Sequence, residues 1–259
     1  MLALGVDIGG SGMKGNVVNT ATGEILSKRL RIPTPRPGTI PEVAEVLAEI
    51  VGHFRTEWGD PSLPVGCGFP GVVKAGIVGS ATHLDKMWLG ADVVTAFSEA
   101  VGSTVTVLND ADAAGLAEIA FGSAQGYRGS VLMITLGTGI GSGMFRQGRL
   151  VPNFELGMLE LDGHHPIEDR VAYRIYKQSS LSWKKWAKRL NRYLDHVGSL
   201  FAPDLIVIGG GAVNKWSKFS RHLDVPVALK PARFGNHAGL LGAGLAAVKP
   251  ELVGDADPV

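Results

Sequence analysis

The feature that most constrains this chain is an apolar run that ends in glycines, A-L-G-V-D-I-G-G-S-G-M-K-G at residues 3–15. The apolar part is typical of a buried strand, and the glycines after it predict a sharp turn with exposed backbone N–H groups. Successive N–H groups in such a turn form a concavity that binds anions. The stretch therefore predicts a phosphate-binding turn, with the carboxylate of Asp7 near its tip.

Two further glycine turns follow apolar segments. They read T-L-G-T-G-I-G-S-G at residues 135–143 and I-G-G-G at residues 208–211. A single turn of this kind is also compatible with an ordinary loop that holds no ligand. Three of them favour one phosphate-bearing ligand that is held from several sides.

Residues 10–15 also fit the dinucleotide fingerprint G-x-G-x-x-G, so a Rossmann domain has to be considered. That fingerprint requires a helix at the glycines and an acidic residue about 20 positions later. Here a second strand-like run follows at residues 25–32, and Arg29 and Arg31 stand where the acid should be. The pattern therefore favours a β-hairpin, and no P-loop consensus is present.

Composition narrows the class of protein. The chain has 259 residues, of which 45% are hydrophobic, and its 36 glycines lie between periodic segments, which favours an α/β fold with many tight turns. The single cysteine, Cys67, excludes an internal disulfide and a multi-cysteine metal site. Neither a signal peptide nor an apolar run of about 18 residues is present, so we expect a cytoplasmic protein with no membrane partner.

The net charge is close to zero, at +1, but the bases are unevenly distributed. Residues 170–194 contain eight lysines and arginines and no acidic residue. Such a stretch is a candidate track for an anion. The alternative is a solvated helix face whose charges are balanced elsewhere in the fold.

Periodicity predicts a helix around residues 43–54, with Pro41 in its first turn and an end at Gly59. Strands are predicted at residues 63–69 and 72–78. The loop beyond them carries polar and aromatic groups of the kind that hold a sugar, which are His83, Asp85, Lys86 and Trp88.

A short helix is predicted at residues 92–100 and a strand at residues 104–108, which ends at Asn109, Asp110 and Asp112. A carboxylate just past the carboxyl end of a strand lies where open α/β sheets place their chemistry. Asp110 is therefore the candidate general base. The alternative is that Asp110 or Asp112 only caps the following helix.

The second half of the chain repeats the strand and glycine-hairpin pattern at residues 131–151. His164 and His165 follow an acid-rich segment, but adjacent histidines point in different directions, which makes a metal site there a minor alternative. Helices are predicted at residues 183–196 and 238–248. The second of these is so rich in small residues that we expect it to pack closely against another backbone.

Together these segments resemble the ROK family of sugar kinases and repressors, and within it the actinobacterial polyphosphate glucokinases. The resemblance extends over nearly the whole chain. It is carried by D-I-G-G-S-G-M-K-G at 7–15, G-F-P-G-V-V at 68–73, L-D-K-M-W at 84–88, L-N-D-A-D-A-A-G-L-A-E at 108–118, L-G-T-G-I-G-S at 136–142, L-V-P-N-F-E-L-G at 150–157 and W-K-K-W-A-K at 183–188.

The resemblance implies an α/β fold of the actin-like ATPase and hexokinase type, which is ribonuclease H-like and has two domains. A small N-terminal α/β domain is expected at residues 1–110, completed by the C-terminal helix at 238–250. A large C-terminal α/β domain is expected at residues 111–237.

The implied activity is transfer of a phosphoryl group from inorganic polyphosphate or ATP to the 6-hydroxyl of glucose, with mannose as the next substrate. Asp110 would take the proton from that hydroxyl. The sugar would be bound by Asn109, Asp110, Glu155, Glu168 and, at the position of a family asparagine, His83. Phosphates and nucleotide would be bound by Asp7, Gly9, Gly10, Ser11, Gly12, Lys14, Gly137, Thr138, Gly139, Gly209, Gly210 and Gly211.

The resemblance also implies Mg²⁺ held through water by Asp7, and a path for polyphosphate along Lys184, Lys185 and Lys188. Zinc is not expected, because the cysteine-rich motif of many family members is missing. A homodimer with no nucleic-acid partner is expected. Repressors of the family carry an additional helix-turn-helix before the first strand, and because this sequence opens directly on the strand of the phosphate-binding turn, we do not expect a repressor.

Two departures from the family pattern lie among the sugar ligands. Met158 stands where the family has a histidine, and His83 stands where it usually has an asparagine. A thioether cannot replace the hydrogen bonds of an imidazole, which costs about 1–3 kcal/mol. The alternatives are therefore a kinase for a different polyol and a non-catalytic protein that binds sugar or polyanion. Nucleic-acid binding through the basic stretch at residues 170–194 is a third alternative.

Overall fold

The computed structural model describes residues 1–80 and 86–253. The chain forms two compact units, of which the first combines Met1–Ala117 with His237–Val259 and the second is Glu118–Asn236. Helix α3 (Asp110–Phe121) belongs to both, because the division falls inside it. Within the described residues, no helix has the length and apolar character needed to cross a bilayer.

The first unit is built on a mixed sheet with the strand order β3-β2-β1-β5-β8 and with β4 also paired to β2. The strands β1 and β2 form the predicted hairpin, whereas β1, β5 and β8 run parallel. The run at residues 25–32 is two short strands rather than one. The bounds are β1 Leu2–Gly9, β2 Gly12–Asn19, β3 Glu24–Ile25, β4 Leu30–Ile32, β5 Val65–Phe69 and β8 Val105–Asn109.

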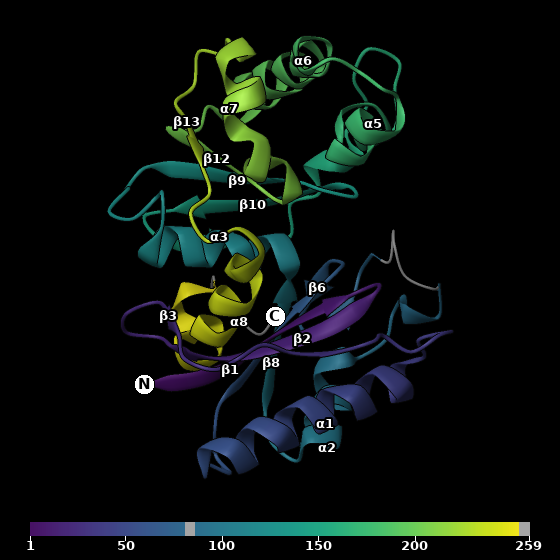
Figure 1. Cartoon of the computed structure of the whole chain (residues 1–259), viewed down its shortest axis with the longest axis vertical. Coiled ribbons are helices and arrows are strands. Elements are labelled where there is room, and N and C mark those ends of the chain that lie inside the picture. The colour runs from purple at the N-terminus through teal and green to yellow at the C-terminus, as the bar shows by residue number, and fades with distance from the viewer. Residues whose placement is uncertain (81–85, 254–259) are drawn as a thin grey trace. The chain divides into compact units, whose positions relative to one another are not determined.

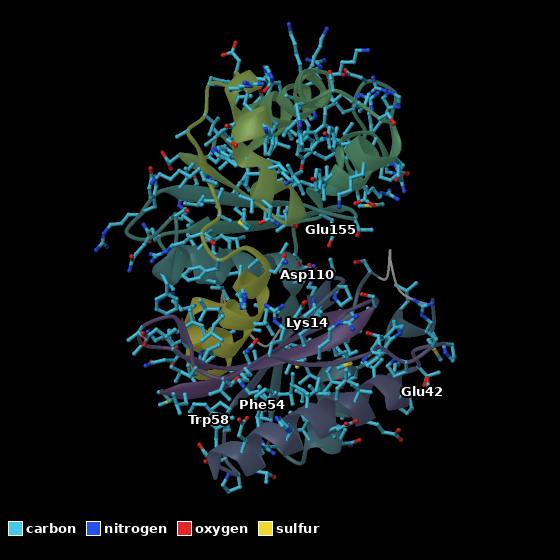
Figure 2. The ribbon with its side chains drawn as sticks, viewed as in Figure 1. Lys14, Glu42, Phe54, Trp58, Asp110 and Glu155 are labelled. Atoms are coloured by element: carbon cyan, nitrogen blue, oxygen red, sulfur yellow. The ribbon has the colours of Figure 1, made fainter. Side chains whose placement is uncertain are left out.

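Helix α1 (Ile40–Trp58) begins and ends where local sequence signals predict. Thr39 and Glu42 form a capping box, Pro41 lies in the first turn, and Gly59 closes the helix with a φ of 63°. The apolar face of α1 packs under the sheet, where Phe54 is fully buried (Figure 2). Helix α2 (Val93–Val101), capped by Asp92, packs beside α1 (Figure 1).

The opposite face of this sheet is covered by α8 (Ala238–Val248), which matches the predicted bounds (Figure 1). A Cβ added to Gly5 would lie 1.9 Å from the carbonyl oxygen of Leu240, and one added to Gly66 would lie 1.9 Å from that of Ala243. Glycines therefore let the helix backbone rest directly on β1 and β5. The predicted close packing of this helix is confirmed.

Trp88 has a different role from the one that the sequence predicted. It ends η1 (Lys86–Trp88), is 1% exposed, and packs its ring against Phe69 and Phe97. Its indole N–H donates to the carbonyl of Gly38 at 3.1 Å. Trp88 is therefore a core residue of the first unit. The short hairpin β6 (Val73–Lys74) and β7 (Ile77–Val78) precedes it.

The second unit is built on a sheet with the order β11-β10-β9-β12-β13. Its long helix α6 (Trp183–Phe201) buries one face, including Trp186, Leu190 and Tyr193, against β9 and β12. The remaining bounds are β9 Ser130–Leu136, β10 Ile140–Arg146, β11 Arg149–Val151, β12 Leu205–Gly209, β13 Leu229–Pro231, α4 Glu168–Val171, α5 Tyr173–Gln178 and α7 Trp216–Phe219. Single-turn helices complete the chain at Leu156–Met158, Gly211–Lys215, Ser220–His222, Gly235–His237 and Pro250–Leu252.

Candidate functional site

The first glycine turn joins β1 to β2 and brings opposite charges together. Gly9 and Gly12 are paired, so Gly10 and Ser11 form the exposed tip of the hairpin. Asp7 and Lys14 are cross-strand partners, and the Lys14 ammonium lies 2.9 Å from the Asp7 carboxylate (Figure 2). Both side chains are about a quarter exposed, at 25% and 28%. The turn therefore presents backbone N–H groups, a cation and a carboxylate together.

Sequence reasoning missed two residues that support this turn. The Arg31 guanidinium donates to the carbonyl of Ser11 at 2.7 Å, and the Thr34 hydroxyl donates to the carbonyl of Gly9. Arg31 is the cross-strand partner of Lys14, because β4 pairs with β2. Like charges placed opposite each other repel, so an anion bound beside them is stabilising. The pairing register of β4 is the signal that identifies Arg31.

The Asp7 site suits a magnesium ion. Mg²⁺ is usually held by one or two carboxylates together with substrate phosphates and waters, rather than by a full cage of protein ligands. A single partly exposed carboxylate beside a phosphate-binding turn meets that requirement. Among the described residues no group of three or more His, Cys, Asp or Glu side chains could hold a metal, so the alternative site at His164 and His165 lacks a ligand set.

Asn109 caps α3, a role that the sequence had offered to Asp110 or Asp112. It is the last residue of β8, and its side-chain oxygen accepts from the N–H groups of Ala111 at 2.8 Å and Asp112 at 3.2 Å. Its amide donates to the carbonyl of Gly71 at 3.2 Å. The cap places Asp110 in the first turn of α3, with its side chain partly exposed (Figure 2).

The other two glycine turns lie together in the second unit. Strands β9 and β12 are parallel neighbours, and Thr135 pairs with Gly209. The carboxyl ends of the two strands therefore lie side by side, and so do the turns that follow them. Gly137 donates its N–H to the carbonyl of Gly139, which closes the β9–β10 turn and leaves Thr138 exposed at its tip.

Gly210 joins these two turns at close range. Its φ and ψ of 72° and −173° are accessible almost only to glycine. A Cβ at this position would lie 2.6 Å from the carbonyl oxygen of Leu136. Gly211 follows it and begins η3 (Gly211–Lys215), beside the ring of Tyr173. The predicted turn at residues 208–211 is thus held against the β9–β10 turn.

Glu155 and Glu168, both predicted sugar ligands, lie near each other in the second unit. Glu168 is 5% exposed, and its carboxylate accepts the N–H of Ile140 at 2.9 Å, directly after the β9–β10 turn. Ser142 holds the Glu155 segment by donating to the carbonyl of Phe154 and accepting the N–H of Leu156.

The position of Glu155 affects its ionisation. Burial raises the pKa of Glu155, and the charge of Glu168 raises it further. Gly157 lets this segment approach β10, because a Cβ there would lie 2.5 Å from the carbonyl oxygen of Ile140. The pair offers acceptor oxygens to the hydroxyls of a polyol.

The remaining predicted site residues are the three lysines of α6, which the structure describes, and His83, which it does not. Lys184, Lys185 and Lys188 are exposed on α6, and the last two line a basic pocket that Lys184 does not line. His83 lies outside the described residues, as does Asp85.

Comparison with known proteins gives consistent matches. The sequence model that describes the ROK family matches residues 3–172 of this chain. The polyphosphate glucokinase of Mycobacterium tuberculosis is 40% identical over 245 residues, which are 94% of this chain and 90% of that protein. The chain has the α/β fold of actin-like ATPases and hexokinases, because solved ROK structures superpose on nearly all of it.

Among those structures, the inorganic polyphosphate/ATP-glucomannokinase from Arthrobacter sp. strain KM has a TM-score of 0.90 and 41% identity, and the match covers 96% of this chain and 99% of that one. A ROK family glucokinase from Streptomyces griseus, solved in complex with glucose and AMPPNP, has a TM-score of 0.78 at 22% identity, with 94% and 98% covered. A family model that matches most of the chain, together with relatives of 40% identity, shows that this chain belongs to the ROK family.

Proposed function

We propose that the protein is a sugar kinase that transfers a phosphoryl group from inorganic polyphosphate or ATP to the 6-hydroxyl of glucose. The observation that carries this proposal is the likeness, over almost the whole chain, to a polyphosphate glucokinase and to a polyphosphate/ATP-glucomannokinase. Mannose is the second substrate, in keeping with the name of the latter.

Asp110 acts as the general base. A carboxylate within hydrogen-bond reach of the sugar hydroxyl accepts its proton as the oxygen attacks the terminal phosphorus. The Asn109 cap supports this role, because it fixes the first turn of α3 and so limits the positions that the Asp110 carboxylate can take. The amide of Asn109 has a second N–H donor for a sugar oxygen.

The hairpin of the first unit neutralises the donor phosphates. Lys14 and Arg31 supply positive charge, and the N–H groups around Gly9, Gly10, Ser11 and Gly12 supply hydrogen bonds. Asp7 holds Mg²⁺ through water, and the ion, when bound, neutralises part of the negative charge on the transferring phosphoryl group. Phosphoryl transfer depends mostly on such alignment and charge neutralisation.

The second unit contributes the remaining ligands. The turn at Gly137, Thr138 and Gly139 binds phosphate through its backbone, and the turn at Gly209–Gly211 approaches the adenosine when ATP is the donor. Glu155 and Glu168, with His83, bind sugar hydroxyls. Lys184, Lys185 and Lys188 bind the polyphosphate chain. The proposal includes a homodimer that works in the cytoplasm.

The test is formation of glucose 6-phosphate in the presence of Mg²⁺, with ATP and with long-chain polyphosphate as donors, and with mannose and other hexoses as acceptors. We expect Asp110→Asn to lower kcat by about 10²–10⁴-fold with either donor, because an amide cannot take the proton. Glu45→Gln, an exposed change on α1, is the matched control. Normal turnover in Asp110→Asn would refute the role of the base, and no phosphorylation of any hexose would refute the kinase.

A further inference from the structure

The chain passes between its two units twice, and one buried carboxylate lies close to both crossings. The first crossing falls between Ala117 and Glu118, inside α3, and the second falls between Asn236 and His237. The second belongs to residues 232–237, which lead from β13 to α8 and which we call the returning segment (Figure 1). Glu118 is 1% exposed. It belongs neither to the glycine turns nor to the predicted sugar ligands.

The Glu118 carboxylate accepts backbone N–H groups from two segments of the chain. Its Oε1 atom accepts the N–H groups of Arg233 at 2.8 Å and Phe234 at 3.0 Å, both in the returning segment. Its Oε2 atom accepts the N–H of Ser123 at 2.8 Å, just beyond the end of α3. Among the residues that the structure describes, no lysine, arginine or histidine nitrogen lies within 4 Å of this carboxylate. Three backbone N–H groups therefore offset the cost of burying the charge.

Further contacts join the end of α3 to the chain that returns to α8. Ser123 donates its hydroxyl to the carbonyl of Pro231, and Lys230 donates to the carbonyl of Ser123 at 3.2 Å. Gly122 leaves room for the carboxylate, because a Cβ there would lie 2.1 Å from the Oε2 atom of Glu118. The two segments are therefore joined by several hydrogen bonds, of which Glu118 accepts three.

The same chain contacts α3 again nearer to the beginning of that helix. A Cβ added to Gly242 of α8 would lie 1.7 Å from the carbonyl oxygen of Ala113, so the two helix backbones touch there. A Cβ added to Gly239 would lie 3.9 Å from the carbonyl oxygen of Asp110. Residues 233–242 therefore contact α3 at Glu118, near its end, and again beside the proposed general base.

We propose that Glu118 is a positioning residue, which fixes α3 to the returning segment and thereby fixes the position of Asp110. This inference rests on the proposed kinase function, in which Asp110 takes the proton of the sugar hydroxyl. Because α3 contains the first crossing and the returning segment leads into the second, the hydrogen bonds of Glu118 make the two crossings move together. Without these bonds α3 is free to shift against the returning segment, and a displacement of about 1 Å at a reacting group can cost about 100-fold in rate.

The first experiment measures amide hydrogen exchange in Glu118→Ala. Alanine is the best helix former, so α3 is expected to be retained, but it accepts no hydrogen bond. We expect the amides of Ser123, Arg233 and Phe234 to exchange about tenfold faster than in the wild type, because a lost hydrogen bond of this kind accounts for about that factor. Glu99→Gln, which replaces an exposed carboxylate on α2, is the control and should leave these rates within about twofold.

The second experiment measures steady-state kinetics at a temperature at which urea unfolding shows every variant to be folded. We expect Glu118→Ala to lower kcat about tenfold with ATP and with polyphosphate, and to leave the KM of glucose within about twofold, because the sugar ligands are unchanged. Glu118→Gln should lose only about threefold, since its single carbonyl oxygen still serves one of the two segments.

A double-mutant cycle distinguishes positioning of the base from a purely structural role. In the Asp110→Asn background, Glu118→Ala should lower the residual kcat by less than about twofold, because the group through which Glu118 acts is already missing. A residue that only stabilises the fold would give the same loss in both backgrounds.

Three results would overturn the inference. Wild-type exchange rates at the three amides in Glu118→Ala would show that the carboxylate does not hold the returning segment. Faster exchange with an unchanged kcat would limit Glu118 to a role in stability, and equal losses of kcat with and without the Asp110 carboxylate would show that it does not act through the base. If the wild type phosphorylates no sugar, the proposed function is refuted and the positioning of a base with it, whereas the exchange rates still decide whether Glu118 joins α3 to the returning segment.

Discussion

The two glycine hairpins have the same strand-turn-strand form but different chemistry. The β1–β2 hairpin carries Asp7 and Lys14 on neighbouring strands, with Arg31 at its edge. The turn of the β9–β10 hairpin, T-L-G-T-G-I-G-S-G at residues 135–143, has no charged side chain, and the Glu168 carboxylate accepts the N–H of Ile140 within it. The first hairpin is therefore suited to neutralising charge, and the second to orienting a phosphate through backbone N–H groups.

Removing the central cation of the charged hairpin should have the largest effect. We expect Lys14→Met to lower kcat/KM about 10²–10³-fold with either donor. The variant lacks the ammonium group that would neutralise the donor phosphate, and Asp7 is left without its ion pair. Thr138→Val, at the tip of the uncharged hairpin, should cost less than about tenfold, since the backbone there is unchanged. Equal losses in the two variants would contradict the division between the hairpins.

The uncharged hairpin should be more sensitive to backbone crowding. We expect Gly210→Ala to lower the free energy of unfolding by about 3 kcal/mol or more, because its Cβ would overlap the Leu136 carbonyl and its φ is positive. Urea unfolding measures this change. Gly52→Ala, where a Cβ meets nothing within 4 Å in a helix, is the control and should stabilise by about 1 kcal/mol. Stability of Gly210→Ala close to wild type would show that the two turns are not tightly packed.

Arg31 should matter for the donor rather than for the sugar. We expect Arg31→Ala to raise the KM of the phosphoryl donor about tenfold and to leave the KM of glucose within about twofold, because the variant lacks the guanidinium that donates to the Ser11 carbonyl. Steady-state kinetics with each substrate varied separates the two constants. Arg29→Ala, an exposed arginine that contacts His237, is the matched control. A larger effect on glucose than on the donor would refute this role.

The acidic pair of the second unit should produce a smaller, pH-dependent effect. The folded pKa of Glu155 is raised by burial and by Glu168, so the folded state binds more protons than the unfolded state between the usual value, 4.5, and the raised one. Stability is therefore expected to fall as pH rises through that window, and Glu155→Gln should flatten the dependence. Unfolding at a series of pH values measures it.

Sugar binding should depend on pH in the opposite direction from stability, and should strengthen as pH rises. The charged carboxylate accepts hydrogen bonds from hydroxyls, so we expect the KM of glucose to rise as pH falls through the raised pKa of Glu155. Glu155→Gln should give a higher KM, by about tenfold, with less change over the same range. An unaltered pH profile in this variant would show that Glu155 does not bind the sugar in its charged form.

The sequence by itself determined the local elements and most of the candidate residues. The capping box of α1 and the run of small residues in α8 involve residues that are close together in the sequence. The bounds of these two helices could therefore be predicted. The hairpin at Gly9–Gly12 was likewise predictable, because a buried apolar run followed by glycines has few other solutions.

Only the tertiary structure decided which distant residues meet. The pairing of β4 with β2 puts Arg31 at Ser11, and the packing of Trp88 against Phe69 and Phe97 removes it from the sugar ligands. The basic pocket that Lys185 and Lys188 line joins bases of α4 and α6 in the same way. Each of these contacts depends on strand register or helix packing between segments far apart in the chain, which local periodicity does not specify.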